Sequence, residues 1–323
     1  MRKAALIWLI FVFGLLIASA AFCADTEIVP MEDREINHRI DTGETIMLND
    51  GQSSPKVEFC SSPIFEQRFV IKFDLSAYHD VKFGQVRFKF FVLQATNISS
   101  LRLDAWYYER AGDDITEEDY IRGDANAGQY SWDGVSSGST TIEQWAELDV
   151  TDLVNSRVGD YVYFNIRLSG SYPDYDGNVF DPNEGHYYVN VAAQEFGALS
   201  PRLVISSPFV LTGKDRTVYG SITLDGSESY DPDSSLISYQ WRLKCRGNPL
   251  FSRQASGITA TIENLRPGFY DVELTVENEE HKTATGGFIA VCMPGRPGDF
   301  NSDGDVDGAD LASFANEFGK ANR

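Results

Sequence analysis

The sequence predicts an all-β protein made of successive modules. Apolar and polar residues alternate with a period of two in many short runs, which is the pattern of a strand with one buried face. Clusters of Gly, Asn, Asp and Ser separate these runs, as turns require. An apolar stripe with helical spacing follows an Asp-rich stretch near residue 311. We therefore expect β-sandwich modules followed by a short C-terminal helix.

Composition narrows the class of protein. A length of 323 residues allows two or three domains, and 42% hydrophobic with 13% aromatic residues supports packed cores. The formal net charge is −21. Because phosphate groups are bound by Lys and Arg, this charge argues against a nucleic-acid partner or an anionic membrane.

Residues 1–24 have the pattern of a secretory signal peptide. Arg2 and Lys3 precede an apolar run at 4–17, and small residues follow at 18–21. The apolar run is short for a membrane span, so we expect cleavage and export, with no membrane span afterwards; a retained anchor is the alternative. The expected localisation is secreted or at the cell surface.

Residues 25–206 are expected to form the first β-sandwich, of jelly-roll type. Its expected strands lie at 68–73, 86–92, 101–106, 161–168 and 202–205. Phe73 and Leu75 are expected in the core, and Thr151 with Asp152 is expected to cap a short turn. Trp145 begins an alternating run, so we interpret it as a core wedge rather than a platform for sugars.

Three landmarks in this segment, at 68–76, 145–154 and 196–205, follow the order "RxxxxFDLS", "W…DVTxLV" and "PRLxV". In these landmarks the segment resembles an exported β-sandwich family often called the DNRLRE domain. Some members of that family are classed as carbohydrate-binding modules for alginate-type polysaccharides. The resemblance therefore implies a sandwich fold and a polysaccharide as partner.

Residues 207–293 contain "LDGSxSYDPD" at 224–233, "SYxW" at 238–241 and "GxYxVxLTV" at 268–276. These motifs resemble the PKD domain, a small immunoglobulin-like sandwich, and the likeness implies a spacer or weak binder without catalysis. Trp241 is expected to anchor the core, and alternate residues from 270 to 276 share one strand face. The segment at 231–233 is interpreted as a plain turn, with a calcium contact as the alternative.

A linker at 294–298 leads to a calcium loop at 299–310. Side-chain oxygens fall at loop positions 1, 3, 5, 9 and 12, Gly304 falls at position 6, and position 7 offers a backbone carbonyl. This EF-hand spacing predicts Ca²⁺ as the cofactor; a solvated Asp-rich turn is the alternative. The predicted ligands are Asp299, Asn301, Asp303, Asp305, Asp307 and Asp310. Asp310 is shorter than the usual Glu, so the exit helix must approach the ion closely.

The expected exit helix spans 311–318, with Gly319 as its C-cap. Residues 299–323 resemble one dockerin repeat. Dockerins usually carry two repeats and dock onto cohesin modules, so the resemblance implies a cohesin-like or surface-assembly partner. The stripe formed by Leu311, Phe314 and Phe318 needs a cover. We expect the neighbouring sandwich to cover it, with a second copy or a partner as alternatives.

Catalytic motifs are not evident. The four histidines are scattered, and neither a zinc spacing, a Gly-x-Ser-x-Gly elbow nor a phosphate loop is present. Two polar aromatic loops, at 130–133 and 170–186, are candidate sugar sites, although the second could hold structural calcium and both could be plain solvated loops. The candidate sugar-binding residues are Trp132, Tyr172, Asp174, Tyr175 and Asp176.

Among the cysteines, Cys245 and Cys292 are a candidate disulfide pair, and Cys60 is left single.

The sequence as a whole favours a secreted, calcium-binding, non-catalytic protein that binds polysaccharide or takes part in an extracellular assembly. The alternatives are a glycoside hydrolase or lyase, or a component of a polysaccharide catabolic complex, and a structural surface protein without sugar affinity.

Overall fold

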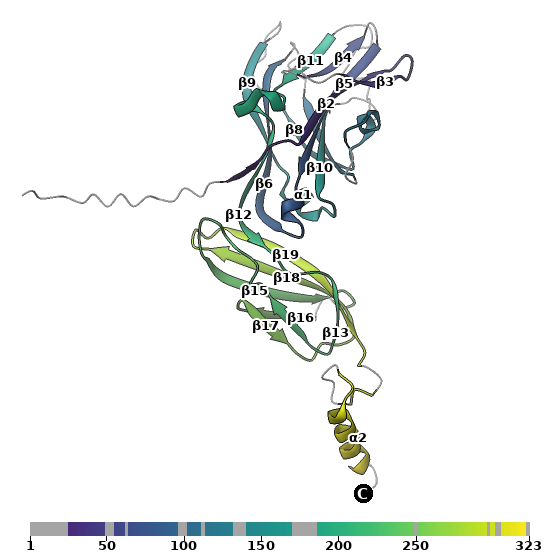
Figure 1. Cartoon of the computed structure of the whole chain (residues 1–323), viewed down its shortest axis with the longest axis vertical. Coiled ribbons are helices and arrows are strands. Elements are labelled where there is room, and N and C mark those ends of the chain that lie inside the picture. The colour runs from purple at the N-terminus through teal and green to yellow at the C-terminus, as the bar shows by residue number, and fades with distance from the viewer. Residues whose placement is uncertain are drawn as a thin grey trace, which may run out of the picture.

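The computed structural model describes residues 25–320 apart from 49–54, 62–63, 96–101, 111–113, 132–139, 170–185, 249–250, 296–297 and 301–304. The predicted signal peptide lies outside these residues. Strands make up most of the regular secondary structure of the described chain, which confirms the all-β prediction. Figure 1 shows two β units stacked end to end, with α2 (Gly308–Lys320) beyond the second.

The first unit contains one sheet whose described strands pair in the order β1-β12-β6-β11-β4-β5-β10-β7-β8. In addition, β2 pairs with β5, β3 pairs with β2, and β9 pairs with β6. Its strands are β1 (Thr26–Ile28), β2 (Glu32–Arg39), β3 (Thr45–Met47), β4 (Lys56–Ser61), β5 (Ile64–Asp74), β6 (Lys82–Ala95), β7 (Leu103–Glu109), β8 (Ala125–Tyr130), β9 (Thr140–Asp149), β10 (Tyr161–Leu168), β11 (His186–Val191) and β12 (Arg202–Val210). Short helical segments are η1 (Ser76–Tyr78), η2 (Glu117–Ile121), α1 (Thr151–Ser156) and η3 (Gln194–Leu199).

The sheet folds over a single apolar core. Phe73 on β5 and Phe88 on β6 lie with ring centroids 6.0 Å apart, and Phe88 stacks on Phe164 of β10 at 4.1 Å. Phe73 and Leu75 are fully buried, as the alternation of apolar residues predicts. The layer of β6, β9 and β12 therefore packs against the layer of β5, β7 and β10.

The outer side of the β5–β10 layer is also covered. Arg68, Val70 and Lys72 on β5 and Tyr163 on β10 are at most 1% exposed, together with Tyr108. Strand β2 and the segment at 115–121, which contains η2, close over them. We call these five residues the sealed face.

Arg68 shows how charge is accommodated on the sealed face. Its Nε lies 2.6 Å from Glu66 Oε1, and its Nη1 donates to the Tyr120 carbonyl at 2.5 Å. The guanidinium also lies 4.1 Å from the centroid of the Tyr120 ring. A polar residue at an outward position of the strand pattern is thus fully buried, because a third layer covers that side of the sheet.

The expected cap of the turn after β9 is wrong in detail. Asp149 Oδ1, and not Thr151, accepts the first bonds, from the Thr151 amide at 3.0 Å and from its hydroxyl at 2.5 Å. Thr151 Oγ1 instead accepts the Val86 amide at 2.9 Å, while no side chain caps α1 at its N-cap, Val150. Thr151 therefore ties the turn to β6.

The second unit is a smaller sandwich. Its strands are β13 (Arg216–Tyr219), β14 (Ile222–Asp225), β15 (Leu236–Cys245), β16 (Ser252–Ser256), β17 (Thr259–Ile262), β18 (Gly268–Asn278) and β19 (Thr283–Met293). Trp241 is 1% exposed and donates its indole N–H to the Gly257 carbonyl at 3.1 Å. Tyr270 and Leu274 on β18 are fully buried against it, which confirms the predicted core anchor and strand face.

Strand β12 joins the two units directly. It runs across residue 206, where the first sandwich was expected to end. Phe209 belongs to the first core and Val210 to the second. The Phe209 amide donates to the Tyr230 carbonyl at 2.8 Å, and their rings lie 5.1 Å apart. Because one strand serves both cores, the second sandwich is held against the first by more than a flexible linker.

Candidate functional site

Several predicted site residues lie outside the described residues. This applies to all five candidate sugar contacts, namely Trp132, Tyr172, Asp174, Tyr175 and Asp176. It also applies to two of the predicted calcium ligands, Asn301 and Asp303. These assignments stay predictions.

The described part of the calcium loop leads directly into α2. Asp307 Oδ1 accepts the Ala309 amide at 2.7 Å, and Asp310 Oδ2 accepts the Asp307 amide at 2.7 Å. This reciprocal pair caps the helix in the manner of a capping box. It explains why α2 begins at Gly308, three residues before the expected start, and it places Asp310 inside the first turn. Gly319, expected as the C-cap, lies within α2.

The oxygen donors predicted for the loop are of the kind that calcium binds. Calcium binds six to eight oxygen atoms, chiefly of carboxylates and carbonyls. Asp310 is 2% exposed, so its carboxylate is held inward at the start of α2 rather than dispersed in solvent. The residues that would hold the ion are Asp299, Asn301, Asp303, Asp305, Asp307 and Asp310. A bound ion would neutralise the crowded acidic groups of the loop.

The apolar stripe of α2 is not covered as expected. Leu311 is 68% exposed and Phe314 is 38% exposed. Phe314 packs on Phe300 of its own loop, with ring centroids 4.7 Å apart. The expectation that the neighbouring sandwich covers the stripe is wrong for these two residues, because α2 projects beyond that sandwich (Figure 1). The side chain of Phe318 lies outside the described part of the helix.

The candidate disulfide is not formed. Cys245, on β15, and Cys292, on β19, are both free thiols. Strand β18 lies between these two strands, with Tyr270 opposite Cys245 and Gly268 opposite Cys292. Two strand spacings separate the cysteines by about 10 Å, which exceeds the Cα separation that a disulfide can bridge.

Trp145 occupies a different place from the predicted one. It is half-buried on the outer side of β9, whereas its neighbours Ala146 and Leu148 point into the core. Its ring makes an edge contact with Phe91 at 5.3 Å. The interpretation as a core wedge is wrong, because the strand's alternation places the inward positions one residue away from Trp145.

Cations surround this tryptophan. The Arg202 guanidinium carbon lies 4.9 Å from the Trp145 ring centroid, and Lys89 Nζ lies 5.3 Å from it. Lys89 pairs with Glu147 at 2.6 Å, and Arg87 pairs with the same carboxylate at 3.3 Å. We call Trp145, Glu147, Lys89, Arg87 and Arg202 the open face.

The open face keeps its carboxylates within reach of solvent. Arg202 pairs with Glu27 at 2.7 Å, and the side chains of Glu27 and Glu147 are 52% and 40% exposed. The hydrogen bond from Lys89 lowers the pKa of Glu147 below its ordinary value of 4.5. The face thus holds an aromatic ring, three cations and exchangeable ion pairs on neighbouring strands β9, β6 and β12.

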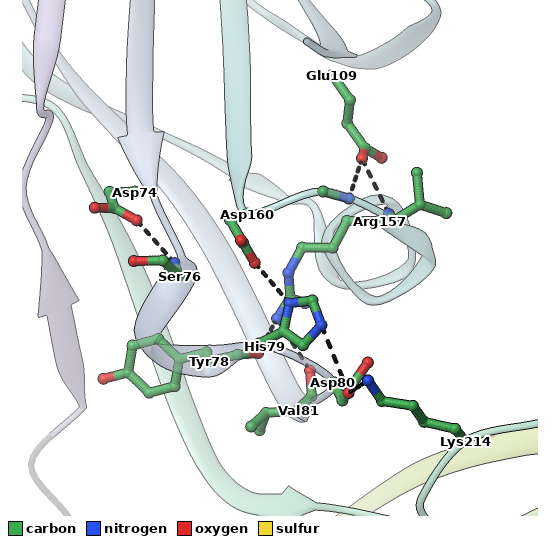
Figure 2. A network of polar contacts seen from close by, with 12 residues as sticks. Asp74, Ser76, Tyr78, His79, Asp80, Val81, Glu109, Arg157, Asp160 and Lys214 are labelled. Carbon is green, nitrogen blue, oxygen red and sulfur yellow. Dashed lines mark hydrogen bonds and ion pairs between the residues drawn. The ribbon is translucent and has the colours of Figure 1, made fainter. Parts of the chain in front are cut away.

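A second polar network lies where the two sandwiches meet (Figure 2). His79 Nδ1 lies 2.8 Å from Asp160 Oδ1, and its Nε2 lies 3.6 Å from Asp80. Lys214 of the second unit reaches Asp80 at 3.4 Å. Arg157 is 8% exposed and donates to the Val154 carbonyl at 2.9 Å, at the end of α1. These contacts indicate a structural role for the network, which forms part of the polar interface between the two domains.

His38 and His281 have their contacts elsewhere. His38 contacts Thr45 Oγ1 at 2.8 Å, and His281 contacts Glu277 at 2.5 Å. Among the residues that the structure describes, no three His, Cys, Asp or Glu side chains converge as a metal site. Within the same residues, no helix combines the length and the apolar character that a membrane crossing requires.

Comparison with known proteins bears on the second sandwich. Residues 212–290 match a family model whose description is that of a PKD domain. This match confirms the PKD prediction. The resemblances to the DNRLRE domain and to a dockerin repeat stay predictions, and no curated protein matches the chain in sequence.

Among solved structures, one similar chain is the M60 catalytic domain with the CBM51-1 and CBM51-2 domains from Clostridium perfringens ZmpB. The similarity has 10% identity and a TM-score of 0.22, and covers 84% of this chain but 24% of that chain. Another is the CBM51-2 and INT domains of the same protein, with 7% identity, a TM-score of 0.20 and 84% coverage of both chains. The present chain thus spans about a quarter of the first of these, and TM-scores this low do not indicate a common fold.

Proposed function

We propose that this chain is an exported, non-catalytic, multi-modular protein that binds an anionic polysaccharide through the open face of its first sandwich. The observation that carries the proposal is Trp145, half-buried on an outward strand position and flanked by Lys89 and Arg202. The C-terminal loop is proposed to bind calcium.

The chemistry of the open face suits such a ligand. An aromatic ring offers an apolar surface to the C–H face of a sugar ring. Guanidinium groups form strong, charge-assisted hydrogen bonds with carboxylates, and here Arg202 Nη1 binds Glu27 at 2.7 Å while Arg87 Nη2 binds Asp25 at 2.6 Å. A sugar carboxylate competes with Glu27, Asp25 and Glu147 for these groups. All three competitors are partly exposed, so water satisfies them after exchange.

The charge distribution restricts how an anionic ligand can bind. The whole chain carries a net charge of −21, which repels polyanions at long range. Arg202 on β12 nevertheless lies opposite Lys89 on β6, and Arg87 lies two residues away on the same side of β6. Local complementarity therefore has to act at contact distance, which favours a flat chain lying directly on the sheet.

The test is a binding panel of alginate, polygalacturonate and cellulose, measured by affinity electrophoresis and calorimetry with and without calcium. We expect retention of wild type by an acidic polysaccharide without its turnover, and loss of retention in Trp145→Ala. Phe269→Ala is the matched control, because Phe269 is a 55% exposed aromatic residue on the second sandwich. Flat isotherms for all three polymers would contradict the proposal, and turnover would favour the enzyme alternative.

The calcium proposal has a test of its own. Asp299→Ala or Asp303→Ala removes a predicted ligand, so we expect the calcium isotherm to be lost and α2 to fray. Glu273→Ala, which removes an exposed carboxylate of β18, is the control. An unchanged calcium isotherm in either Asp variant would refute the site.

A second candidate function is assembly through α2. The exposure of Leu311 and Phe314 leaves an apolar surface of the kind that a docking partner covers. Pull-down of a purified cohesin module that depends on Leu311 would support it. The absence of such capture at high protein concentration would leave polysaccharide binding as the remaining role.

A further inference from the structure

A polar cleft of about 640 Å³ lies where the first sandwich meets the PKD domain. The first sandwich contributes Gln85, Asp152 and Ser207 to its walls, and the PKD domain contributes Lys282 and Thr283. Residues that carry hydroxyl, amide, carboxylate and ammonium groups therefore line one space from two domains, with Lys282 Nζ paired to Glu280 at 2.9 Å. Such a mixture of donors and acceptors matches a ligand rich in hydroxyl groups.

The cleft continues the open face. Along β9 and β6, Trp145 lies opposite Phe91, Glu147 opposite Lys89, and Asp149 opposite Arg87. Residues two apart on a strand share one side of the sheet. Arg87 and Asp149 also line the cleft. The side of the sheet that carries Trp145 therefore extends as far as the cleft.

The far wall of the cleft is held firmly. Asn278 is fully buried at the end of β18, and its Oδ1 accepts the amides of Glu280 at 3.0 Å and Lys282 at 2.8 Å. Its Nδ2 donates to Asp231 at 2.8 Å. The turn that carries Lys282 is therefore positioned by a buried amide before any ligand arrives, which limits the entropy lost on binding.

The two walls also approach each other through their backbones. A Cβ atom placed on Gly84 would lie 3.2 Å from the Thr283 carbonyl and 3.0 Å from the Ser207 carbonyl. Glycine at this position leaves room for the contact without displacing either carbonyl. Because β12 contributes to both cores and its Ser206 and Ser207 line the cleft, the width of the cleft is set by direct packing of the domains.

We propose that the interdomain cleft is a second subsite for the polysaccharide, so that a chain seated on Trp145 continues across the junction onto Lys282 and Thr283. The PKD domain then contributes directly to binding rather than serving as a spacer. This inference rests on the proposed function of the open face and adds that affinity depends on the length of the ligand.

The experiment compares a disaccharide with a long oligosaccharide, each prepared from alginate and from polygalacturonate, by calorimetry on the full chain. In the double variant Lys282→Ala/Thr283→Ala we expect about tenfold weaker binding of the long oligosaccharide, which is about 1.4 kcal/mol. Disaccharide binding should be unchanged. Trp145→Ala should weaken both, and Lys244→Ala, which removes an exposed lysine of β15, should weaken neither.

The outcomes separate the two proposals. If the double variant binds the long oligosaccharide as wild type does while Trp145→Ala loses both, the subsite is overturned and the open face stands. If wild type binds none of the four probes, the open face is overturned and the subsite with it. Thermal unfolding of every variant shows whether it folds; both substituted cleft residues are exposed, so a native unfolding midpoint is expected.

Discussion

The two outer faces of the first sandwich carry similar residues and treat them in opposite ways. On the sealed face, Arg68 and Lys72 are buried under a third layer and stacked on tyrosine rings. On the open face, Arg87 and Lys89 keep 30% and 21% of their side chains exposed beside a half-buried tryptophan. An aromatic ring with a cation is structural where a layer covers it, and is a candidate binding surface where none does.

The same contrast holds for carboxylates. Glu35 is 8% exposed, and burial raises its pKa above the ordinary value of 4.5, although the Lys56 amide and the Gln67 side chain donate to it at 2.5 and 2.6 Å. Glu147 on the open face has its pKa lowered, first by the hydrogen bond from Lys89. The buried carboxylate thus has a raised pKa, and the partly exposed carboxylate has a lowered one.

The largest effect should come from breaking the sealed face. Arg68→Ala leaves Glu66, which is 1% exposed, without its cation, and should lower the free energy of unfolding by about 3–5 kcal/mol. Arg87→Ala on the open face should cost about 0–1 kcal/mol. Urea denaturation of both variants measures the difference. Equal losses would mean that the two faces do not differ in the way described.

The second largest effect should be that of ionic strength, which should weaken ligand binding at the open face more than the stability of the sealed face. Raising salt from 0.1 to 1 M shortens the screening length from about 10 to about 3 Å, so binding of an acidic polysaccharide should weaken by roughly tenfold. Stability from the buried Arg68–Glu66 pair should change little. Calorimetric titrations and urea midpoints at both salt concentrations test this. Salt-independent binding would show that the cations around Trp145 do not contact the ligand.

The smallest effects concern pH. Glu35 binds its proton more tightly in the folded state, so its contribution to stability is present below pH 4.5 and is lost as pH rises through its raised pKa. Glu147 shows the reverse: its contribution is present above pH 4.5 and is lost as pH falls through its lowered pKa. Glu35→Gln and Glu147→Gln should flatten opposite limbs of the stability profile, as measured by urea midpoints from about pH 3 to 7. Identical changes in both variants would contradict the assignment.

The sequence pattern predicts burial best where a residue's environment depends only on its own strand. The alternation around Phe73 and along 270–276 identified buried positions because each strand has one face on a core. The alternation pattern gives the wrong face for Trp145, and it does not predict the burial of Arg68. Trp145 was assigned to the wrong face of its strand, and Arg68 is covered by chain that is distant in sequence.

The candidate site shows the same division. The calcium loop stays a prediction, and the sequence could propose it because the spacing of the candidate ligands is a local property of the chain. The open face could not be predicted, since Trp145, Lys89 and Arg202 come from three strands that are brought together by pairing. The interdomain cleft depends in addition on how β12 crosses from one core to the other.

By itself the sequence determined the all-β class, the PKD module and the loop-then-helix tail, because strand period, turn residues and ligand spacing are local properties of the chain. Only the tertiary structure decided which polar face of the first sandwich is covered, that the two cysteines of the PKD domain are held apart by β18, and that the two sandwiches share a strand. These features depend on contacts between distant segments, and no local pattern encodes those contacts.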